Sequence, residues 1–81
     1  MISEGLKQKF ICAGWFPNYN GSYENMHKHY KSGELAVISG CGLTIQSKNG
    51  KSETYYVETI KDVCELLKAN GIRDFNLEGY Q

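Results

Sequence analysis

The sequence predicts an α+β fold, in which an antiparallel β-hairpin sheet and a short C-terminal strand pack against two or three helices. Three observations support this class: an apolar helical stripe over residues 59–70, an alternating pattern on both sides of Asn49-Gly50, and a second helical stripe near the start of the chain. With 81 residues, the chain has room for a single domain, 1–81, around one core.

Residues 3–13 are expected to form the first helix. Its apolar stripe at helical spacing comprises Ile2, Leu6, Phe10 and Ala13. Ser3 suits the N-cap position, because its hydroxyl accepts from the free backbone N–H groups of the first turn. Gly14 suits the left-handed position that follows a helix, and Trp15 can then fold back onto the last turn.

The next segment predicts a turn and a second helix. Residues 18–21 have the composition of a turn, and Ser22 resembles another N-cap. The positions that would share one face of this helix are Tyr23, Met26, His27 and Tyr30. Gly33 is expected to end it.

Residues 35–48 change to a strand-like character. The apolar run 35–38 fits either a buried strand or a buried helical turn, and the sequence leaves this open. The glycines of Gly40-Cys41-Gly42 suggest a bulge or a close approach of two backbones. From Leu43 onward apolar and polar residues alternate as they do in a half-buried strand.

The dipeptide Asn49-Gly50 favours a type I′ hairpin turn with a two-residue loop. That loop would pair Lys48 with Lys51 and Ile45 with Thr54. The expected core face then carries Leu43, Ile45, Thr54 and Tyr56. The opposite face, open to solvent or a partner, would carry Thr44, Gln46, Lys48, Lys51, Glu53 and Tyr55.

The last helix is expected over residues 59–70. Thr59 and Asp62 have the spacing of a capping box, with Asp in place of the usual Glu. Its apolar stripe comprises Ile60, Val63, Cys64 and Leu67, with Leu66 beside it. Gly71 and Ile72 repeat the Gly-apolar ending of the first helix. Alternation over residues 75–78 predicts a final short strand.

Charge and hydropathy argue against several functional classes, although nucleic-acid binding through a small patch stays open. The nine basic and nine acidic residues are scattered, without the basic cluster that marks a nucleic-acid-binding module. No apolar run approaches the roughly 20 residues that a membrane helix needs. Residues 1–7 lack the apolar stretch of a secretion signal, so a cytoplasmic location is expected.

Cysteine and histidine residues offer little chemistry. The three cysteines, Cys12, Cys41 and Cys64, are odd in number and widely spaced, which predicts buried free thiols acting as small apolar residues rather than disulfides or zinc ligands. On a helix, His27 and His29 would point about 200° apart and could not share a metal ion, whereas on a strand they could. The sequence therefore predicts no catalytic residue, metal or cofactor, and a small thiol- or metal-dependent enzyme is the alternative from another class.

The chain contains six tyrosines, and tyrosine is enriched at protein interfaces. Two surfaces are candidates: the second predicted helix with the loop before it, and the outer side of the hairpin. The candidate partner-binding residues are Tyr19, Tyr23, Glu24, Tyr30, Thr44, Gln46, Glu53 and Tyr55.

Several segments resemble one subgroup of the SUKH immunity proteins. Residues 13–17 (AGWFP) match its "GW-x-P" opening after a first helix, and the helix expected over Tyr23 to Tyr30 matches the short helix that follows in that subgroup. Residues 40–45 match its glycine-rich turn into a strand. The tyrosines at 55 and 56, followed by a helix at Thr59, match the end of its second strand. The chain departs from the subgroup in being shorter and in having Asn18 and Tyr19 where a basic residue follows the proline.

The resemblance implies a bacterial antidote that binds and blocks a toxin and has no catalytic residues. The sequence thus predicts a small protein-binding module that blocks a partner protein. A phage or mobile-element inhibitor of a host defence complex is the alternative of the same kind. A homodimer through a free sheet edge is a further possible assembly.

Overall fold

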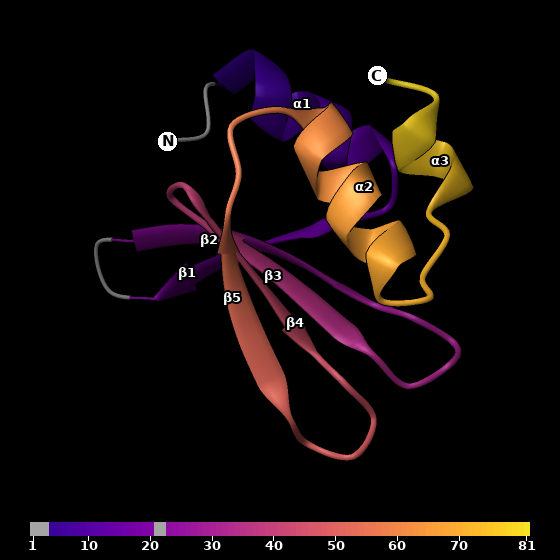
Figure 1. Ribbon diagram of the computed structural model, residues 1–81. Coiled ribbons are helices and arrows are strands. Elements are labelled where there is room, and N and C mark those ends of the chain that lie inside the picture. Colours follow the sequence, from indigo (N-terminus) through magenta and orange to yellow (C-terminus); the bar gives the residue numbers. More distant parts are fainter. Residues whose placement is uncertain (1–3, 21–22) are drawn as a thin grey trace.

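In the computed structural model, which describes residues 4–20 and 23–81, five strands form one antiparallel sheet in the order β1-β2-β3-β4-β5 (Figure 1). The strands are β1 (Phe16–Asn20), β2 (Tyr23–His29), β3 (Leu35–Ser39), β4 (Gly42–Gln46) and β5 (Ser52–Tyr56). The helices are α1 (Glu4–Cys12), α2 (Ile60–Ala69) and α3 (Phe75–Glu78). The predicted α+β class is confirmed, although the sheet is larger than the sequence suggested.

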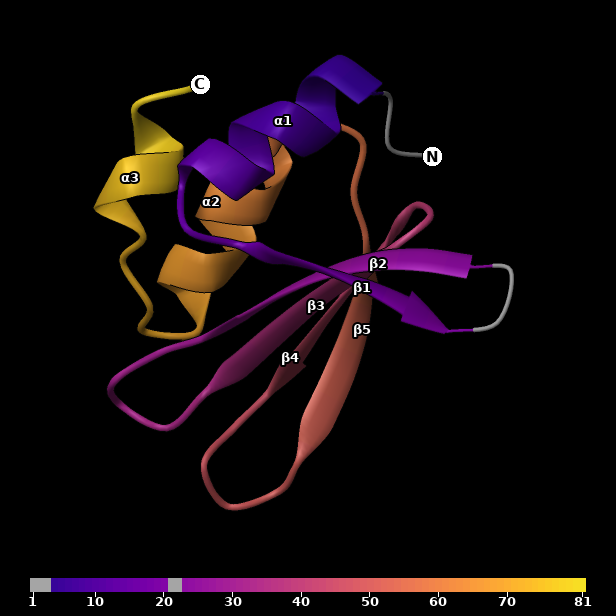
Figure 2. The same cartoon turned by 180° about the vertical axis from the view of Figure 1, so that it is seen from behind.

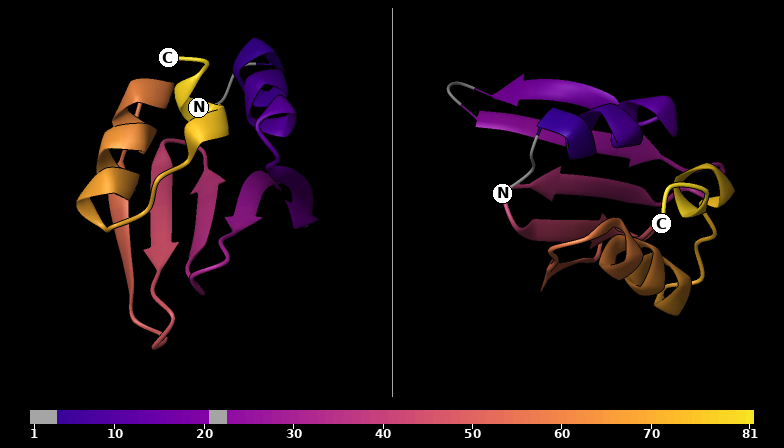
Figure 3. Two further views of the ribbon diagram at one scale, coloured as in Figure 1. Left: turned by 90° about the vertical axis from the view of Figure 1, so that its right-hand side faces the viewer. Right: turned by 90° about the horizontal axis from the view of Figure 1, so that it is seen from above.

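All three helices lie on one side of the sheet, which is twisted so strongly that the β1–β2 hairpin crosses the direction of β5 (Figures 1 and 2). Seen from above, α1 lies over β1 and β2, and α2 lies over the other half of the sheet (Figure 3). The helix-facing side, here called the inner face, and the helices bury the core between them. Its buried apolar side chains are Phe10, Ala13, Trp15, Met26, Ala36, Ile38, Leu43, Ile45, Val57, Ile60, Val63, Cys64, Leu67, Ile72 and Leu77.

The end of α1 forms as predicted. Gly14 has a φ of 94°, and its N–H donates to Ile11 O while the N–H of Trp15 donates to Phe10 O. This pair of hydrogen bonds is the Schellman ending, and the rings of Phe10 and Trp15 complete it with an edge-on contact at 5.0 Å. The expected contributions of Ile2 and Ser3 lie outside the described residues.

Both ends of α2 also form as predicted. Thr59 Oγ1 accepts from the N–H of Asp62, and Asp62 Oδ2 accepts from the N–H of Thr59, which completes the capping box. Gly71 has a φ of 79°, and the N–H of Ile72 donates to Leu67 O. The four stripe residues expected to face the core are buried.

The predicted turn and second helix are wrong: residues 16–20 form β1 and residues 23–29 form β2. The hydropathy pattern of residues 23–29 is misleading because β2 places both Met26 and a lysine, Lys28, on the inner face. The apolar–polar alternation expected of a half-buried strand is therefore hidden. Asn, His and Tyr form helices only moderately well, and pairing with two neighbouring strands outweighs that preference. Ser22, the predicted cap, lies outside the described residues. Pro17 fits β1 because that strand is at the sheet edge.

The open question at residues 35–38 resolves to a strand, β3. Gly40-Cys41-Gly42 is not a bulge, because Ser39 pairs with Gly42 and residues 40–41 form the tight turn between β3 and β4. Only Gly40 has a positive φ, 62°, which is the pattern of a type II′ hairpin turn.

The predicted register of the β4–β5 hairpin is wrong by one residue. Ile45 pairs with Glu53 rather than Thr54, and Ser47 N–H donates to Lys51 O around a three-residue loop. In that loop Gly50 alone has a positive φ, 93°, so the type I′ turn is also wrong. A shift of one residue exchanges the faces of a strand, and Tyr55 therefore points inward while Tyr56 is exposed.

The predicted C-terminal strand is wrong as well, because residues 75–78 form α3. Asp74 caps this helix by accepting from the N–H of Leu77 at 3.1 Å. Leu77 is buried and Phe75 is exposed. The two apolar residues therefore do not share one face, as they would in the predicted strand. None of the helices described over residues 4–20 and 23–81 is long and apolar enough to cross a bilayer.

Candidate partner-binding face

The side of the sheet opposite the helices, here called the outer face, is the candidate site. Among the residues whose side chains the structure describes, the strand pairing assigns to it one position from β1 and three from each of β2, β3, β4 and β5. These thirteen residues are Phe16, Asn25, His27, His29, Leu35, Val37, Ser39, Gly42, Thr44, Gln46, Ser52, Thr54 and Tyr56.

One row of this face runs across all five strands. Phe16 pairs with His27, His27 with Val37, Val37 with Thr44, and Thr44 with Thr54. The rings of Phe16 and His27 lie 6.0 Å apart, and the hydroxyls of Thr44 and Thr54 are hydrogen-bonded at 2.9 Å. The row is therefore a continuous strip of aromatic, aliphatic and methyl-bearing side chains.

No residue among the thirteen is Asp, Glu, Lys or Arg. Those four types make up 22% of the chain, which would place about three of them on thirteen positions. Phe16 is 63% exposed and Tyr56 is 70% exposed. A solvent-facing side of an antiparallel sheet is normally polar, so this face combines exposure with an unusual lack of charge.

Charged groups lie at the border of the outer face rather than on it. Tyr56 OH donates to Glu58 Oε1 at 2.8 Å, and this bond raises the pKa of the Tyr56 phenol. Lys48 and Lys51 are exposed in and beside the β4–β5 loop. An uncharged centre with a charged rim is the distribution found in protein interfaces.

Two polar atoms of the outer face are buried without a hydrogen-bond partner in the described part of the chain. They are Asn25 Oδ1 and His27 Nδ1, which belong to neighbouring outward positions of β2. Buried polar atoms are nearly always bonded in folded proteins, so these two atoms are exceptions within the described part of the chain.

The residues predicted to bind a partner are only partly brought together. Thr44 and Gln46 lie on the outer face, whereas the assignment of Glu53 and Tyr55 to it is wrong because of the register shift. The Tyr55 hydroxyl donates to Glu53 on the inner side, and the Tyr55 ring packs against the core. The backbones of Tyr19, Tyr23 and Glu24 belong to β1 and β2, and the placement of their side chains lies outside what the structure describes.

Tyr30 belongs to a buried polar cluster that was not predicted from the sequence. The centre of this cluster is Asp74, which is 4% exposed. Its carboxylate accepts from Trp15 Nε1 at 3.0 Å, from Tyr30 OH at 2.8 Å and from Lys28 Nζ at 3.1 Å. Lys28 Nζ also donates to Ala13 O at 3.1 Å.

Protonation in this cluster follows from the contacts. Burial opposes ionisation of Asp74, but hydrogen bonds from Tyr30, from the N–H of Leu77 and from Lys28 outweigh it and lower the pKa of the carboxyl. Burial and the bond to Asp74 raise the pKa of Tyr30. The carboxylate is thus held ionised by groups from β2, α3 and the end of α1, which is the arrangement of a structural tie. A lone Asp after a helix gives no signal in the sequence that it will be buried.

The cysteines and histidines do not gather into one site. His27 and His29 lie on β2, Cys41 lies in the β3–β4 turn, and no three metal-ligating side chains among the described residues could hold one ion. The expected burial of the thiols is confirmed for Cys64 and wrong for Cys12, which is exposed, because Cys12 lies at the end of α1 outside its buried stripe. Burial raises the pKa of the Cys64 thiol to about 11, which makes it unreactive at neutral pH.

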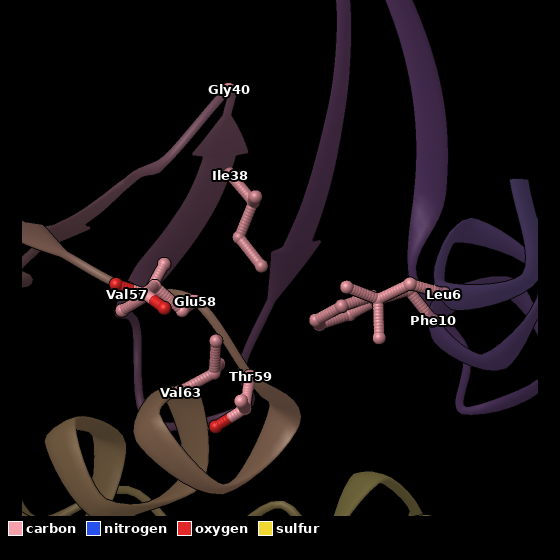
Figure 4. Close-up of a pocket in the computed structure, with 8 residues that line it drawn as sticks. All are labelled: Leu6, Phe10, Ile38, Gly40, Val57, Glu58, Thr59 and Val63. Carbon is pink, nitrogen blue, oxygen red and sulfur yellow. The ribbon is translucent and has the colours of Figure 1, made fainter. Parts of the chain in front are cut away.

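A small cavity lies between the inner face of the sheet and the helices, where α1, β3 and the segment entering α2 meet (Figure 4). It is lined by Leu6, Phe10, Ile38, Gly40, Val57, Glu58, Thr59 and Val63. Its volume of about 20 Å³ is the space of a single water molecule, so this cavity cannot accommodate a substrate.

Comparisons of the chain with protein-family models, with curated proteins and with solved structures found no match, so the resemblance to SUKH immunity proteins stays a prediction.

Proposed function

We propose that this protein is a binding module that recognises another protein through the outer face of its sheet. The observation that supports this most directly is the combination of exposed aromatic side chains, Phe16 and Tyr56, with the absence of fixed charge over thirteen positions. Aromatic residues are enriched and charged residues are depleted at the centre of protein interfaces. The principal extents of the molecule, 31 × 30 × 21 Å, leave room for the roughly 800 Å² that a standard interface needs from each partner.

The chemistry of the outer face defines the partner. It offers no Lys or Arg that could neutralise phosphates, which argues against nucleic acid as the ligand of this face. Its hydroxyl, amide and imidazole groups suit a partner that brings apolar side chains together with a few hydrogen-bonding groups. We therefore infer a folded protein with an apolar, uncharged patch, and charges of either sign around it.

In the specific form that the SUKH resemblance favours, the module is an immunity protein that blocks a bacterial toxin. Binding over the toxin's active site would suffice, and the module would need no catalytic group of its own. The alternative is an inhibitor of a host defence complex, carried by a phage or mobile element. A toxin gene beside this one would favour the first form, and a prophage gene cluster would favour the second.

Two matched variants, a double and a single substitution, test the proposed face. Phe16→Ala with Tyr56→Ala removes the exposed rings of the outer face, whereas Phe75→Ala removes a ring that is as exposed as Tyr56, at 70%, but lies in α3. The wild type and the Phe75 variant should form a 1:1 complex with the purified partner encoded nearby and protect cells that express it. The double variant should lose at least tenfold in affinity, with an unchanged melting temperature.

The proposal is contradicted if the double variant binds like the wild type while the Phe75 variant does not. The enzyme alternative has its own test in thiol alkylation at neutral pH. Cys12 is exposed and Cys41 is half-buried, so simple accessibility predicts faster modification of Cys12. Much faster alkylation of Cys41 would favour a reactive thiol and weaken the binding proposal.

The free edge of β5 favours a second mode of assembly, a homodimer. Ser47 N–H donates to Lys51 O and Val57 N–H donates to Cys41 O, so the backbone groups of the alternate residues between them, such as Thr54, point away from β4. The other edge strand, β1, contains Pro17, which limits pairing there. Thr54→Pro would remove only an N–H directed outward, and it should abolish any dimer seen by light scattering without unfolding the sheet.

A further inference from the structure

Two imidazoles stand side by side on the outer face. His27 and His29 are alternate residues of β2, so both side chains project from the same side of the sheet. Their ring centroids lie 5.8 Å apart with an interplanar angle of 82°. They are the two histidines of the chain, and any imidazole ligation by this protein must use them.

This spacing is close to what a shared metal ion requires. With metal–nitrogen distances of 2.0–2.1 Å, two imidazoles bound to one ion at a tetrahedral angle have ring centres about 5 Å apart. The observed 5.8 Å therefore exceeds the chelating separation by less than one ångström, which small side-chain rotations can supply.

Neither the surroundings nor the hydrogen bonding of the pair opposes a cation. No Lys or Arg shares the outer face, and His27 Nδ1 has no hydrogen-bond partner in the described part of the chain. An ion bound by the His27 ring would therefore displace no internal hydrogen bond at Nδ1.

The geometry points to a bidentate site, formed by His27 and His29, for a divalent transition-metal ion of the Zn²⁺, Ni²⁺ and Cu²⁺ class. Imidazole nitrogen suits these ions, whereas Mg²⁺ and Ca²⁺ require several oxygen ligands. No third ligating His, Cys, Asp or Glu joins the pair among the described residues, so the remaining coordination positions are open to water or to an external ligand. Affinity should rise from Zn²⁺ and Ni²⁺ to Cu²⁺. The site does not depend on the proposed binding function.

The test is a Zn²⁺ titration at pH 7.5, followed by NMR of the histidine side chains. Cys12→Ser with Cys41→Ser provides the background, so that accessible thiols do not compete for the ion. Resonances of both rings should shift together and saturate at one ion per chain. His27→Gln and His29→Gln should each weaken binding at least tenfold, because each removes half of a chelate. Gln46→Ala, on the same face in the row of His29, should change the affinity by less than twofold.

A rescue variant sharpens the test. Val37 lies directly opposite His27 on β3, where paired Cβ atoms are about 5 Å apart. His29→Gln with Val37→His should therefore restore chelation that His29→Gln alone has lost. The site is refuted if the two rings of the folded background protein titrate independently and bind two ions, or if neither ring shifts at millimolar Zn²⁺.

Discussion

The two faces of the sheet treat polar groups in opposite ways. On the inner face, the carboxylate of Asp74 is buried and accepts hydrogen bonds from Trp15, Lys28, Tyr30 and the backbone of Leu77. The outer face has no fixed charge, and it leaves two buried polar atoms without a partner in the described chain. The polar cluster under the helices thus satisfies its hydrogen bonds within the fold, whereas two polar atoms of the outer face have no partner among the described residues.

This difference separates stability from recognition. Removing a buried charge partner leaves the other charge desolvated, so changes on the inner face should be costly. Surface substitutions away from such features usually change stability by less than half a kcal/mol. The comparison therefore predicts that inner-face variants lose stability and that outer-face variants lose binding.

The largest effect is expected for Asp74→Ala. This change leaves the ammonium of Lys28, the indole N–H of Trp15 and the hydroxyl of Tyr30 without their shared acceptor. The free energy of unfolding should fall by about 3–5 kcal/mol, as when one partner of a buried ion pair is removed. Urea denaturation followed by circular dichroism measures this. A loss below about 1 kcal/mol would mean that Asp74 is not the structural tie described above.

A somewhat smaller loss is expected for Leu67→Ala. Leu67 is fully buried, at 0% exposure, in the stripe that α2 presents to the core. Deleting its side chain should lower the free energy of unfolding by about 2–4 kcal/mol, through lost burial and the cavity left behind. Lys68→Ala, one residue further along and exposed, is the matched control and should stay near the wild type.

Acid should progressively lower the free energy of unfolding through the cluster at Asp74. The pKa of Asp74 is lowered in the folded protein, so its ionised form contributes stability that is complete above the unfolded value, near pH 4, and is lost as the pH falls through the folded value. Urea denaturation at a series of pH values between 7 and 2 should show this decline. The decline should be clearly smaller in Asp74→Asn, which carries no ionisable group at this position. If the free energy of unfolding fell equally steeply with pH in both proteins, Asp74 would not be the source of the acid sensitivity.

The smallest effect on stability is expected for Tyr56→Ser on the outer face. Its ring is 70% exposed, so the free energy of unfolding should change by less than about 0.5 kcal/mol. The adjacent substitution Tyr55→Ser provides the comparison, because Tyr55 packs against the core and should cost distinctly more. If the two substitutions cost the same, the orientation of β5 would need revision.

The helix ends could be predicted from sequence because their signals are local. Gly14-Trp15 and Gly71-Ile72 each place a left-handed glycine before an apolar residue, and both form the expected ending. Thr59 and Asp62 interact within one turn, so their spacing determines the capping box.

The strands β1 and β2 pair with their neighbours in the sequence, yet they could not be predicted, because a contact with a distant residue hides the alternation of β2. Lys28 occupies an inner position by pairing with Asp74, 46 residues away, and that contact hides the alternation. The same holds for the candidate site: an outer face made of five strands exists only once all five are paired in register. Thr44 and Gln46 were placed on it correctly because the alternation within β4 is local.

The wrong prediction of the β4–β5 register has a different cause. Asn-Gly suits a two-residue type I′ loop, but a three-residue loop with glycine in the left-handed position is also common. The chain adopts the second form, with Ser47 and Lys51 closing the loop. The sequence around Gly50 does not distinguish the two, and the choice reverses which tyrosine of β5 faces the core.

The cluster at Asp74 also governs how the chain acquires its structure. It joins Trp15 to a residue 59 positions later and Lys28 to one 46 positions later, so these contacts require long segments of the chain to be closed into loops. Until the C-terminal segment docks, the ammonium of Lys28 lacks the carboxylate with which it pairs in the folded chain. Because Trp15 is the single tryptophan and bonds this carboxylate directly, its fluorescence during refolding would time the moment at which the molecule closes.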